Sequence, residues 1–281
     1  MKIFLMVASL AACAPTTILT PRSAPMTHAH YANVNGLRMY YEDHGEGPPM
    51  VLIHGGGSTV QTSFGAILPR LARSHRVIAV EQQAHGHTED LDRPLSFEQM
   101  ADDTAALLGQ LQVHNADVLG FSNGGMTALQ VAVRHPALVH RLVVCSGFYA
   151  HANLIPGLRA AFERPPNADE MPRPLRDAYL AAAPHADLNA FVAKTVAMMR
   201  SFPDLTEDQL RAIDAPTLVM VGEEDVVLPE HAARLAKLVK HGQLAIMPGA
   251  HGSYLGVAES PPPSPALFER AVGIIEKFLA P

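Results

Sequence analysis

The chain contains no tryptophan, has only two cysteines among its 281 residues, and carries no excess of positive charge. Its 21 lysines and arginines are outnumbered by 27 aspartates and glutamates, and they are scattered singly along the sequence. Binding to a nucleic acid requires a basic surface, so we expect no nucleic acid partner. Beyond the first residues, no apolar run reaches the roughly 20 residues that cross a bilayer. With 48% hydrophobic residues, the chain can instead bury one sizeable core.

The first residues are typical of an export signal. Lys2 supplies a positive charge, residues 3–10 form a short apolar run, and Leu-Ala-Ala-Cys follows at residues 10–13. We therefore interpret residues 1–25 as a signal and linker. Leu-Ala-Ala-Cys also resembles the bacterial lipobox, and this resemblance implies a lipidated Cys13 that tethers the exported protein to a membrane. The alternative is a cytoplasmic protein whose translation starts at Met26.

The pattern of apolar residues predicts an α/β fold. Residues 31–44 alternate around Asn35-Gly36, the dipeptide that two-residue hairpin turns favour. Six short apolar runs follow, separated by helical patterns, and they cover residues 50–53, 77–80, 117–121, 142–145, 217–221 and 244–247. Unbroken apolar runs indicate strands that are buried on both faces. Together with the hairpin they predict a mostly parallel, eight-stranded sheet that is flanked by helices.

Two local patterns refine this picture. Ser96 and Gln99 form a predicted capping box, in which each side chain bonds the backbone amide of the other at the start of a helix. Cys145 ends one of the apolar runs and is therefore expected to be a buried, inert thiol. With Cys13 lipidated, Cys145 would have no partner for a disulfide.

One long segment interrupts the alternation of strands and helices. Residues 149–212 separate two predicted strands by far more chain than the dozen or so residues that a crossover needs. We interpret this segment as an inserted helical cap on a core of residues 26–148 and 213–281. The predicted cap helices cover residues 175–183, 188–200 and 207–213. A proline-rich spacer at residues 261–265 precedes a final helix, predicted at residues 266–279.

The strongest chemical signal is Gly-Phe-Ser-Asn-Gly at residues 120–124, between a predicted strand and a predicted helix. In this context a G-x-S-x-G sequence indicates a nucleophile elbow, a sharp turn that exposes the serine hydroxyl. A side chain at either glycine would crowd the neighbouring strand or helix. We therefore predict Ser122 as a nucleophile.

A serine nucleophile needs a base and an acid that orients the base. Asp225 follows the predicted strand at residues 217–221, and His251 follows the next strand. Serine, then acid, then histidine is the chain order found in the fold that carries a nucleophile elbow. We predict Asp225 as the acid and His251 as the base, with Glu223 and Glu224 as alternatives to Asp225.

Acyl transfer also needs donors for the negative charge that develops on the carbonyl oxygen. His-Gly-Gly-Gly at residues 54–57 directly follows a buried strand, and its glycines let main chain approach a substrate. We assign these donors to the backbone N–H groups of Gly56 and Asn123, with Gly57 as an alternative to Gly56. This chemistry requires no metal or cofactor. The pairs His28/His30 and His85/His87 are too incomplete to indicate a metal site.

Taken together, these motifs resemble those of the α/β-hydrolase superfamily from Tyr31 to the last helix. Residues 83–88, Gln-Ala-His-Gly-His-Thr, resemble its G-H-G-x-S/T loop, with Ala84 in the first glycine position. Asp225 to Pro229 matches its D-x-x-x-P pattern. The resemblance implies a cap that lies over the serine and shapes the pocket, as in small esterases, enol-lactonases and carbon–carbon bond hydrolases.

Departures from relatives narrow the chemistry. Members that open epoxides or displace halide have an aspartate where this chain has Ser122, so those reactions are disfavoured. Ring-cleavage carbon–carbon hydrolases usually have a tryptophan directly after the catalytic histidine, and this chain has Gly252. Perhydrolases without a cofactor share the triad. Peptidase relatives hold a substrate amine with a cap acid, for which Glu163, Asp169 and Glu170 are candidates.

The leading hypothesis is a serine hydrolase that cleaves small, largely apolar carboxylic esters. The cap residues that favour an apolar pocket are Leu154, Ile155, Leu158, Phe162, Phe191, Met198, Met199 and Phe202. Lactone hydrolysis, carbon–carbon bond cleavage and perhydrolysis on the same triad are alternatives. A ligand-binding protein that keeps the scaffold without turnover is the rival from another class. The sequence does not indicate an oligomeric state.

Overall fold

The computed structural model describes residues 28–280. The predicted signal at residues 1–25 and Cys13 lie outside this range, so export and lipidation stay predictions. Within residues 28–280, no helix combines the length and the apolar character that crossing a membrane requires.

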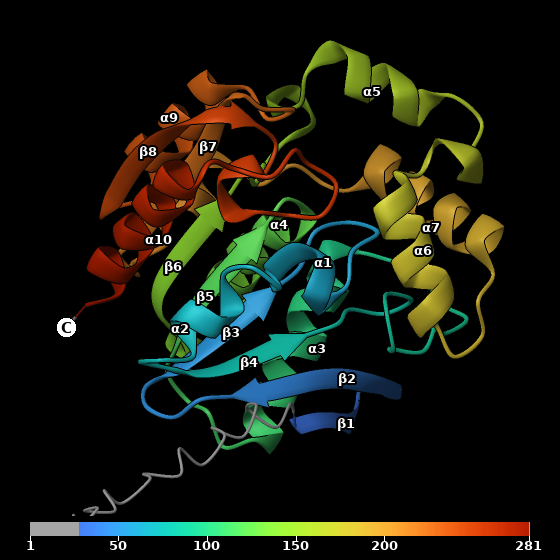
Figure 1. Cartoon of the computed structure of the whole chain (residues 1–281), viewed down its shortest axis with the longest axis horizontal. Coiled ribbons are helices and arrows are strands. Elements are labelled where there is room, and N and C mark those ends of the chain that lie inside the picture. Colours follow the sequence, from blue (N-terminus) through green and yellow to red (C-terminus); the bar gives the residue numbers. More distant parts are fainter. Residues whose placement is uncertain (1–27, 281) are drawn as a thin grey trace, which may run out of the picture.

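A single twisted sheet organises the structure (Figure 1). Its eight strands lie in the order β1-β2-β4-β3-β5-β6-β7-β8. They are β1 (His28–Val34), β2 (Leu37–His44), β3 (Pro49–Ile53), β4 (Arg76–Val80), β5 (Ala116–Phe121), β6 (Val139–Cys145), β7 (Thr217–Glu224) and β8 (Gly242–Ala250). Strands β1 and β2 are antiparallel to their neighbours, and all other pairs are parallel. The predicted mostly parallel, eight-stranded sheet is thus confirmed.

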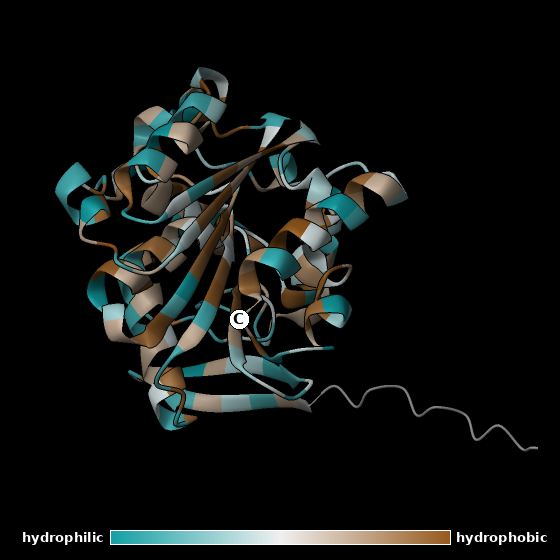
Figure 2. Cartoon of the chain, turned by 90° about the vertical axis from the view of Figure 1, so that its left-hand side faces the viewer, coloured by the Kyte–Doolittle hydropathy of each residue, from teal (hydrophilic) through white to brown (hydrophobic). Residues whose placement is uncertain are grey.

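Helices cover both faces of the sheet. The longer ones in the core are α3 (Phe97–Gln110), α4 (Asn123–Arg134), α9 (Pro229–Leu238) and α10 (Pro265–Leu279), and the short ones are α1 (Val60–Phe64) and α2 (Leu68–Leu71). One apolar cluster packs α1, α2 and α10 against one face, and another packs α3, α4 and α9 against the other. Successive strand residues such as Val51 and Leu52 belong to opposite clusters, because side chains alternate along a strand. Figure 2 shows the resulting hydrophobic strands between more polar outer helix faces.

The structure differs from the sequence predictions at the sheet edges. Strand β1 begins at His28, so the hairpin is longer than the predicted residues 31–44. In β8, Leu244 and Ile246 remain 40% and 41% exposed, which makes the prediction of burial on both faces wrong there. Strand β8 pairs only with β7, and an edge strand has one side without a neighbouring strand.

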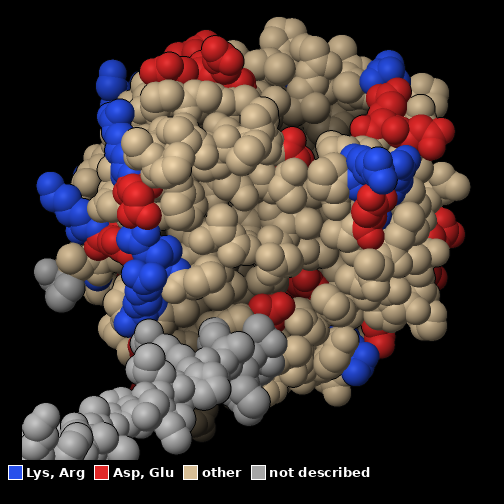
Figure 3. Space-filling model, viewed as in Figure 1, with Lys and Arg blue, Asp and Glu red and all other residues tan. Residues whose placement is uncertain are grey.

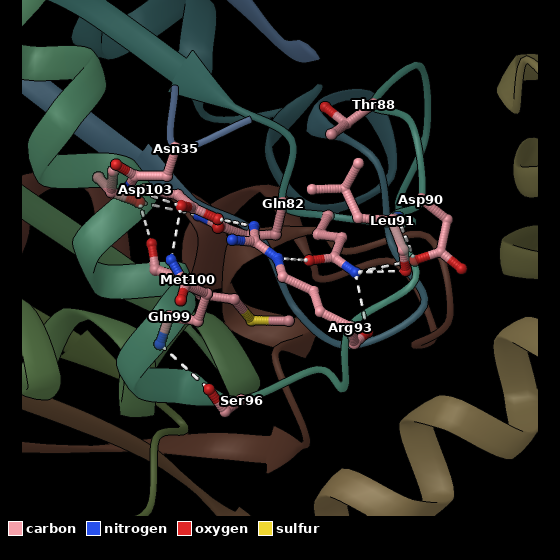
Figure 4. A network of polar contacts seen from close by, with 12 residues as sticks. Asn35, Gln82, Thr88, Asp90, Leu91, Arg93, Ser96, Gln99, Met100 and Asp103 are labelled. Carbon is pink, nitrogen blue, oxygen red and sulfur yellow. Dashed lines mark hydrogen bonds and ion pairs between the residues drawn. The ribbon is translucent and has the colours of Figure 1, made fainter. Parts of the chain in front are cut away.

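The predicted capping box before α3 is only half formed. The Ser96 hydroxyl accepts a hydrogen bond from the Gln99 amide at 3.2 Å, as the box requires. The Gln99 side chain instead donates to Asp103 at 2.9 Å, within a polar network that also contains Asn35 and Arg93 (Figure 4). A buried carboxylate requires several donors, and Asp103 therefore recruits this amide.

Residues 149–212, predicted as the cap, contribute no strand to the sheet. They contain α5 (Pro156–Glu163), α6 (Arg173–Ala182), α7 (Leu188–Ser201) and α8 (Glu207–Arg211). Helices α6, α7 and α8 lie near their predicted positions, whereas α5 was missed. Figure 1 shows α5, α6 and α7 together beside the carboxyl ends of the central strands.

The base of this segment is tied to the loop after β7. Leu154 forms an antiparallel bridge with Val227, and the Ile155 amide donates to the Val226 carbonyl at 2.9 Å. The returning chain is joined to the outgoing one, since the Leu205 amide donates to the Tyr149 carbonyl at 2.8 Å. Both ends of the cap therefore meet at one place on the core.

Candidate active site

Ser122 lies in a strained turn between β5 and α4. Its backbone has φ 54° and ψ −120°, a conformation that costs a residue with a side chain about 1–3 kcal/mol. The flanking glycines make the turn possible. A Cβ atom on Gly120 would lie 2.0 Å from the Gly124 carbonyl oxygen, and one on Gly124 would lie 2.0 Å from the Ile53 carbonyl oxygen. The turn therefore requires glycine at both positions.

Three predicted residues form one hydrogen-bonded chain. The His251 Nδ1 atom lies 2.6 Å from Asp225 Oδ1, and His251 Nε2 lies 2.9 Å from Ser122 Oγ. An ionised carboxylate only accepts, so Nδ1 donates and Nε2 is left to accept the serine proton. Phe121 packs against the imidazole at a centroid distance of 4.9 Å. The alternative acids, Glu223 and Glu224, are exposed at the end of β7.

The Asp225 carboxylate is buried and fully hydrogen bonded. Oδ1 also accepts from the Val227 amide at 3.1 Å, while Oδ2 accepts from the Gly222 amide at 3.0 Å and from Ser146 Oγ at 2.6 Å. Burial by itself would raise the pKa of Asp225, but the hydrogen bonds from His251, Ser146 and Gly222 outweigh it and lower the pKa. Asp225 is therefore ionised at neutral pH and stabilises any positive charge that develops on His251.

The predicted oxyanion donors are neighbours. A Cβ atom on Gly56 would lie 2.4 Å from Asn123 Nδ2, whereas one on Gly57 would face Met171 of the cap at 3.1 Å. Asn123 is the first residue of α4, and the first amides of a helix have no acceptor within the helix. Within residues 28–280, neither the Gly56 nor the Asn123 amide donates to another backbone group. Both amides are thus available beside Ser122.

A cavity of about 330 Å³ separates the glycine loop from the cap. Gly56 and Gly57 form part of its wall, and α5, α6 and α7 supply most of the rest. Its apolar lining includes Leu158, Phe162, Met171, Leu175, Phe191 and Val192. Figure 3 shows the surface hollowed beneath α5. A larger hollow of about 960 Å³, beside β2 and α2, is lined by none of the predicted site residues.

The predicted pocket residues divide into two groups. Leu158, Phe162 and Phe191 line this cavity. The rest do not, because Leu154, Met198, Met199 and Phe202 are buried in the packing of the cap, and Ile155 lies at its base. Among the candidate acids for a substrate amine, Glu170 lines the cavity, although Arg164 pairs with it at 2.6 Å.

Two buried histidines, His54 and His85, lie side by side at the glycine loop. His54 donates from Nδ1 to the Gly55 carbonyl at 2.7 Å and accepts from the Gln82 amide at 3.0 Å. Burial and the neighbouring His85 lower the pKa of His54 to about 3. Burial also lowers the pKa of His85. Both imidazoles are therefore neutral at neutral pH, and His54 fixes the start of the glycine loop.

The remaining histidines and Cys145 were candidates for metal binding or reactivity by residue type alone. In the described range 28–280, no group of three or more His, Cys, Asp or Glu side chains is arranged to hold a metal ion. His87 instead bonds Glu81 at 2.9 Å, and His85 bonds the Gln83 carbonyl at 2.9 Å. Cys145 is buried, and burial raises the pKa of its thiol to about 12, consistent with an inert side chain.

Sequence reasoning missed two residues of this region, Ser146 and Tyr254. Ser146 follows β6 directly and bonds Asp225, and Tyr254 lies in the turn after His251 and bonds Ser146 at 3.0 Å. The position of Ser146 at the end of a predicted strand was the available signal. The missing information was that β6 lies between the strands that carry Ser122 and Asp225.

Comparison with known proteins places this geometry in a family. The model of the alpha/beta hydrolase family matches residues 50–262. The 2-hydroxymuconate semialdehyde hydrolase of Pseudomonas sp. (strain CF600) is 30% identical over 233 residues, which cover 75% of this chain and 82% of that protein.

Solved structures show the same fold. The meta-cleavage product hydrolase of Pseudomonas fluorescens IP01 superposes with a TM-score of 0.72 at 20% identity, over 89% of this chain and 96% of that one. A thermophilic esterase from Thermogutta terrifontis superposes with a TM-score of 0.70 at 23% identity, over 89% and 97%. This chain belongs to the alpha/beta hydrolase family.

Proposed function

We propose that this protein is a serine hydrolase that cleaves small, largely apolar carboxylic esters through an acyl-enzyme. The observation that carries the proposal is the continuous hydrogen-bonded chain from Ser122 through His251 to Asp225, next to two free amides and an apolar cavity. A binding protein would need the cavity but has no use for an oriented base.

The residues act in order during one turnover. Ser122 Oγ attacks the ester carbonyl while His251 Nε2 takes its proton. Asp225 stabilises the imidazolium, and the Gly56 and Asn123 amides bind the oxyanion. His251 then protonates the leaving alcohol. Water, activated by the same imidazole, releases the acid from Ser122.

Carbon–carbon bond cleavage is the second candidate, because the 2-hydroxymuconate semialdehyde hydrolase is a relative at 30% identity. One local feature favours the ester. Gly252, directly after His251, has φ +66°, and a Cβ atom there would lie 2.5 Å from the Phe121 ring. No tryptophan fits after the histidine in this backbone, and ring-cleavage hydrolases usually have one at that position.

Steady-state hydrolysis of p-nitrophenyl acetate, butyrate and octanoate, beside a lactone and a ring-cleavage product, tests the proposal. We expect turnover of the short esters, covalent labelling by a fluorophosphonate, and loss of both in folded Ser122→Ala. If the protein turns over the ring-cleavage product and none of the esters, the bond that it cleaves is the carbon–carbon bond and not the ester bond. A wild-type protein that neither turns over any of these substrates nor becomes labelled would contradict the proposal that it is an enzyme.

A further inference from the structure

Four adjacent strands end at one hydrogen-bonded row of polar side chains. In the sheet order β5-β6-β7-β8, the residues that follow or lie just beyond the strand ends are Ser122, Ser146, Asp225 and His251. The predicted triad accounts for three of these positions. Ser146 occupies the fourth, between the nucleophile and the acid, and the mechanism above gives it no role.

Ser146 is bound on every side. Its hydroxyl lies 2.6 Å from Asp225 Oδ2 and 3.0 Å from the Tyr254 hydroxyl, and its amide donates to the Met220 carbonyl at 2.7 Å. Ser146 and Tyr254 are both fully buried. No solvent competes for these hydrogen bonds, so they hold one arrangement of the carboxylate.

The protons in this cluster have a definite direction. Asp225 accepts only, so the single Ser146 proton is donated to Oδ2. Across the 3.0 Å contact between the hydroxyls, Tyr254 is then the donor, and its one proton is shared between Ser146 Oγ and the Met220 carbonyl at 3.2 Å. Burial raises the pKa of Tyr254 well above its usual value, so the phenol keeps its proton. Ser146 therefore donates to Asp225, and within the hydroxyl pair Tyr254 is the donor to Ser146.

The backbone of Ser146 shows that having a side chain at this position has a cost. Its φ is 49°, in the left-handed region that favours glycine. Glycine would relieve this strain but would leave Asp225 Oδ2 with only the Gly222 amide. A serine in a glycine conformation is explained if its side chain is needed.

We propose that Ser146 is a positioning residue: its hydroxyl, oriented by Tyr254, fixes the Asp225 carboxylate so that the other oxygen faces His251. This rests on the proposed function, because it assumes that Asp225 orients the base. The Ser146 hydroxyl is hydrogen bonded to neither Ser122 nor His251, so it acts through Asp225.

Two substitutions separate the hydroxyl from the strain. Ser146→Ala removes the hydroxyl and keeps the strain, whereas Ser146→Gly removes both. We expect kcat to fall about 10- to 100-fold in each variant, the range that loss of such supporting hydrogen bonds produces, with KM unchanged. Ser146→Gly should unfold at a higher temperature than Ser146→Ala, because only glycine relaxes the backbone. Activity then follows the hydroxyl, and stability follows the backbone.

The exposed residue Gln112, with φ 56°, offers a matched control. Gln112→Gly should raise the unfolding temperature and leave kcat unchanged, which calibrates the effect of relaxing a left-handed residue. Tyr254→Phe should lower kcat less than Ser146→Ala, since the bond from Ser146 to Asp225 persists.

A readout without substrate separates this proposal from the proposed function. The proton between His251 Nδ1 and Asp225 should give a low-field NMR signal that shifts or exchanges faster in Ser146→Ala and Ser146→Gly. If wild type hydrolyses no ester, the proposed function fails, and this signal still decides the role of Ser146. Wild-type kcat and an unchanged signal in both variants would overturn the proposal. Activity lost in Ser146→Ala but restored in Ser146→Gly would also overturn it, because strain alone would then explain the loss.

Discussion

The carboxyl ends of the central strands and the cap are built in opposite ways. Asp225 has a side chain with 0% exposure and four hydrogen bonds to its two oxygens. In the cap, α5 has no buried residue. Charged pairs of the cap are exposed, such as Arg173 with Asp177 on α6, whose side chains are 84% and 57% exposed. On the right of Figure 3, opposite charges lie side by side on the cap surface. The hydrogen bonds of the buried triad are therefore rigid, whereas the walls of the apolar cavity lie in the less buried part.

The largest effect should come from breaking the rigid part at its centre. Ser122→Ala removes the nucleophile, and we expect kcat/KM to fall about 10³- to 10⁶-fold, as for other members of a triad. Ester hydrolysis and circular dichroism measure activity and folding separately. A second change, His251→Ala, should then add little, because the two residues act as a unit. Additive losses of activity in the double variant would contradict the idea that Ser122 and His251 act as one hydrogen-bonded unit.

Acid should weaken the rigid part through His54. Its pKa is about 3 in the folded protein and about 6.5 when unfolded, so the unfolded chain binds more protons between these values. Stability is fully present above the unfolded pKa and falls as the pH drops, by about 1.4 kcal/mol per pH unit from this histidine alone. Urea unfolding from pH 7 to pH 4 measures the slope. In His54→Gln the slope should be shallower, and an identical slope would exclude His54 as its source.

A smaller effect should follow from enlarging the cap wall. Leu158→Ala removes apolar surface from the cavity, and each buried methylene contributes about 0.8 kcal/mol. We expect KM for p-nitrophenyl butyrate to rise about 3- to 10-fold, with little change for acetate, in the range that one or two methylenes allow. Leu180→Ala, at an exposed position of α6, is the control and should change neither. A loss of kcat with KM constant would place Leu158 outside the binding wall.

The smallest effect should come from a polar contact between cap and core. Lys194 Nζ on α7 lies 2.7 Å from Asp90 Oδ2 and 2.7 Å from the Leu91 carbonyl. A partly exposed pair of this kind contributes at most about 1 kcal/mol. Lys194→Met should therefore shift the urea midpoint slightly and leave kcat unchanged. A large rise in the protection of the cap against hydrogen exchange, rather than a small loss, would contradict a stabilising role for this pair.

The same contrast explains what could be predicted from the sequence. The elbow, the acid and the histidine follow strands whose apolar runs are local signals, and strand ends of a parallel sheet share one edge. Ser146 was missed because its role depends on the order of strands in space, which no local pattern encodes. Helix α5 was missed because it has only eight residues and begins with Pro-Gly, so its short apolar pattern does not stand out in the sequence. The exposure of Leu244 and Ile246 likewise depends on β8 lying at the edge.

The bridge between Leu154 and Val227 has a practical consequence for recombination between family members. Val227 also supplies an amide to Asp225, at 3.1 Å, so the segment that attaches the cap shares main chain with the acid. A chimera that exchanges residues 149–212 would replace one half of this bridge. Crossover points at residues 156 and 201 would leave the paired segments native, so the shorter segment is the one to exchange.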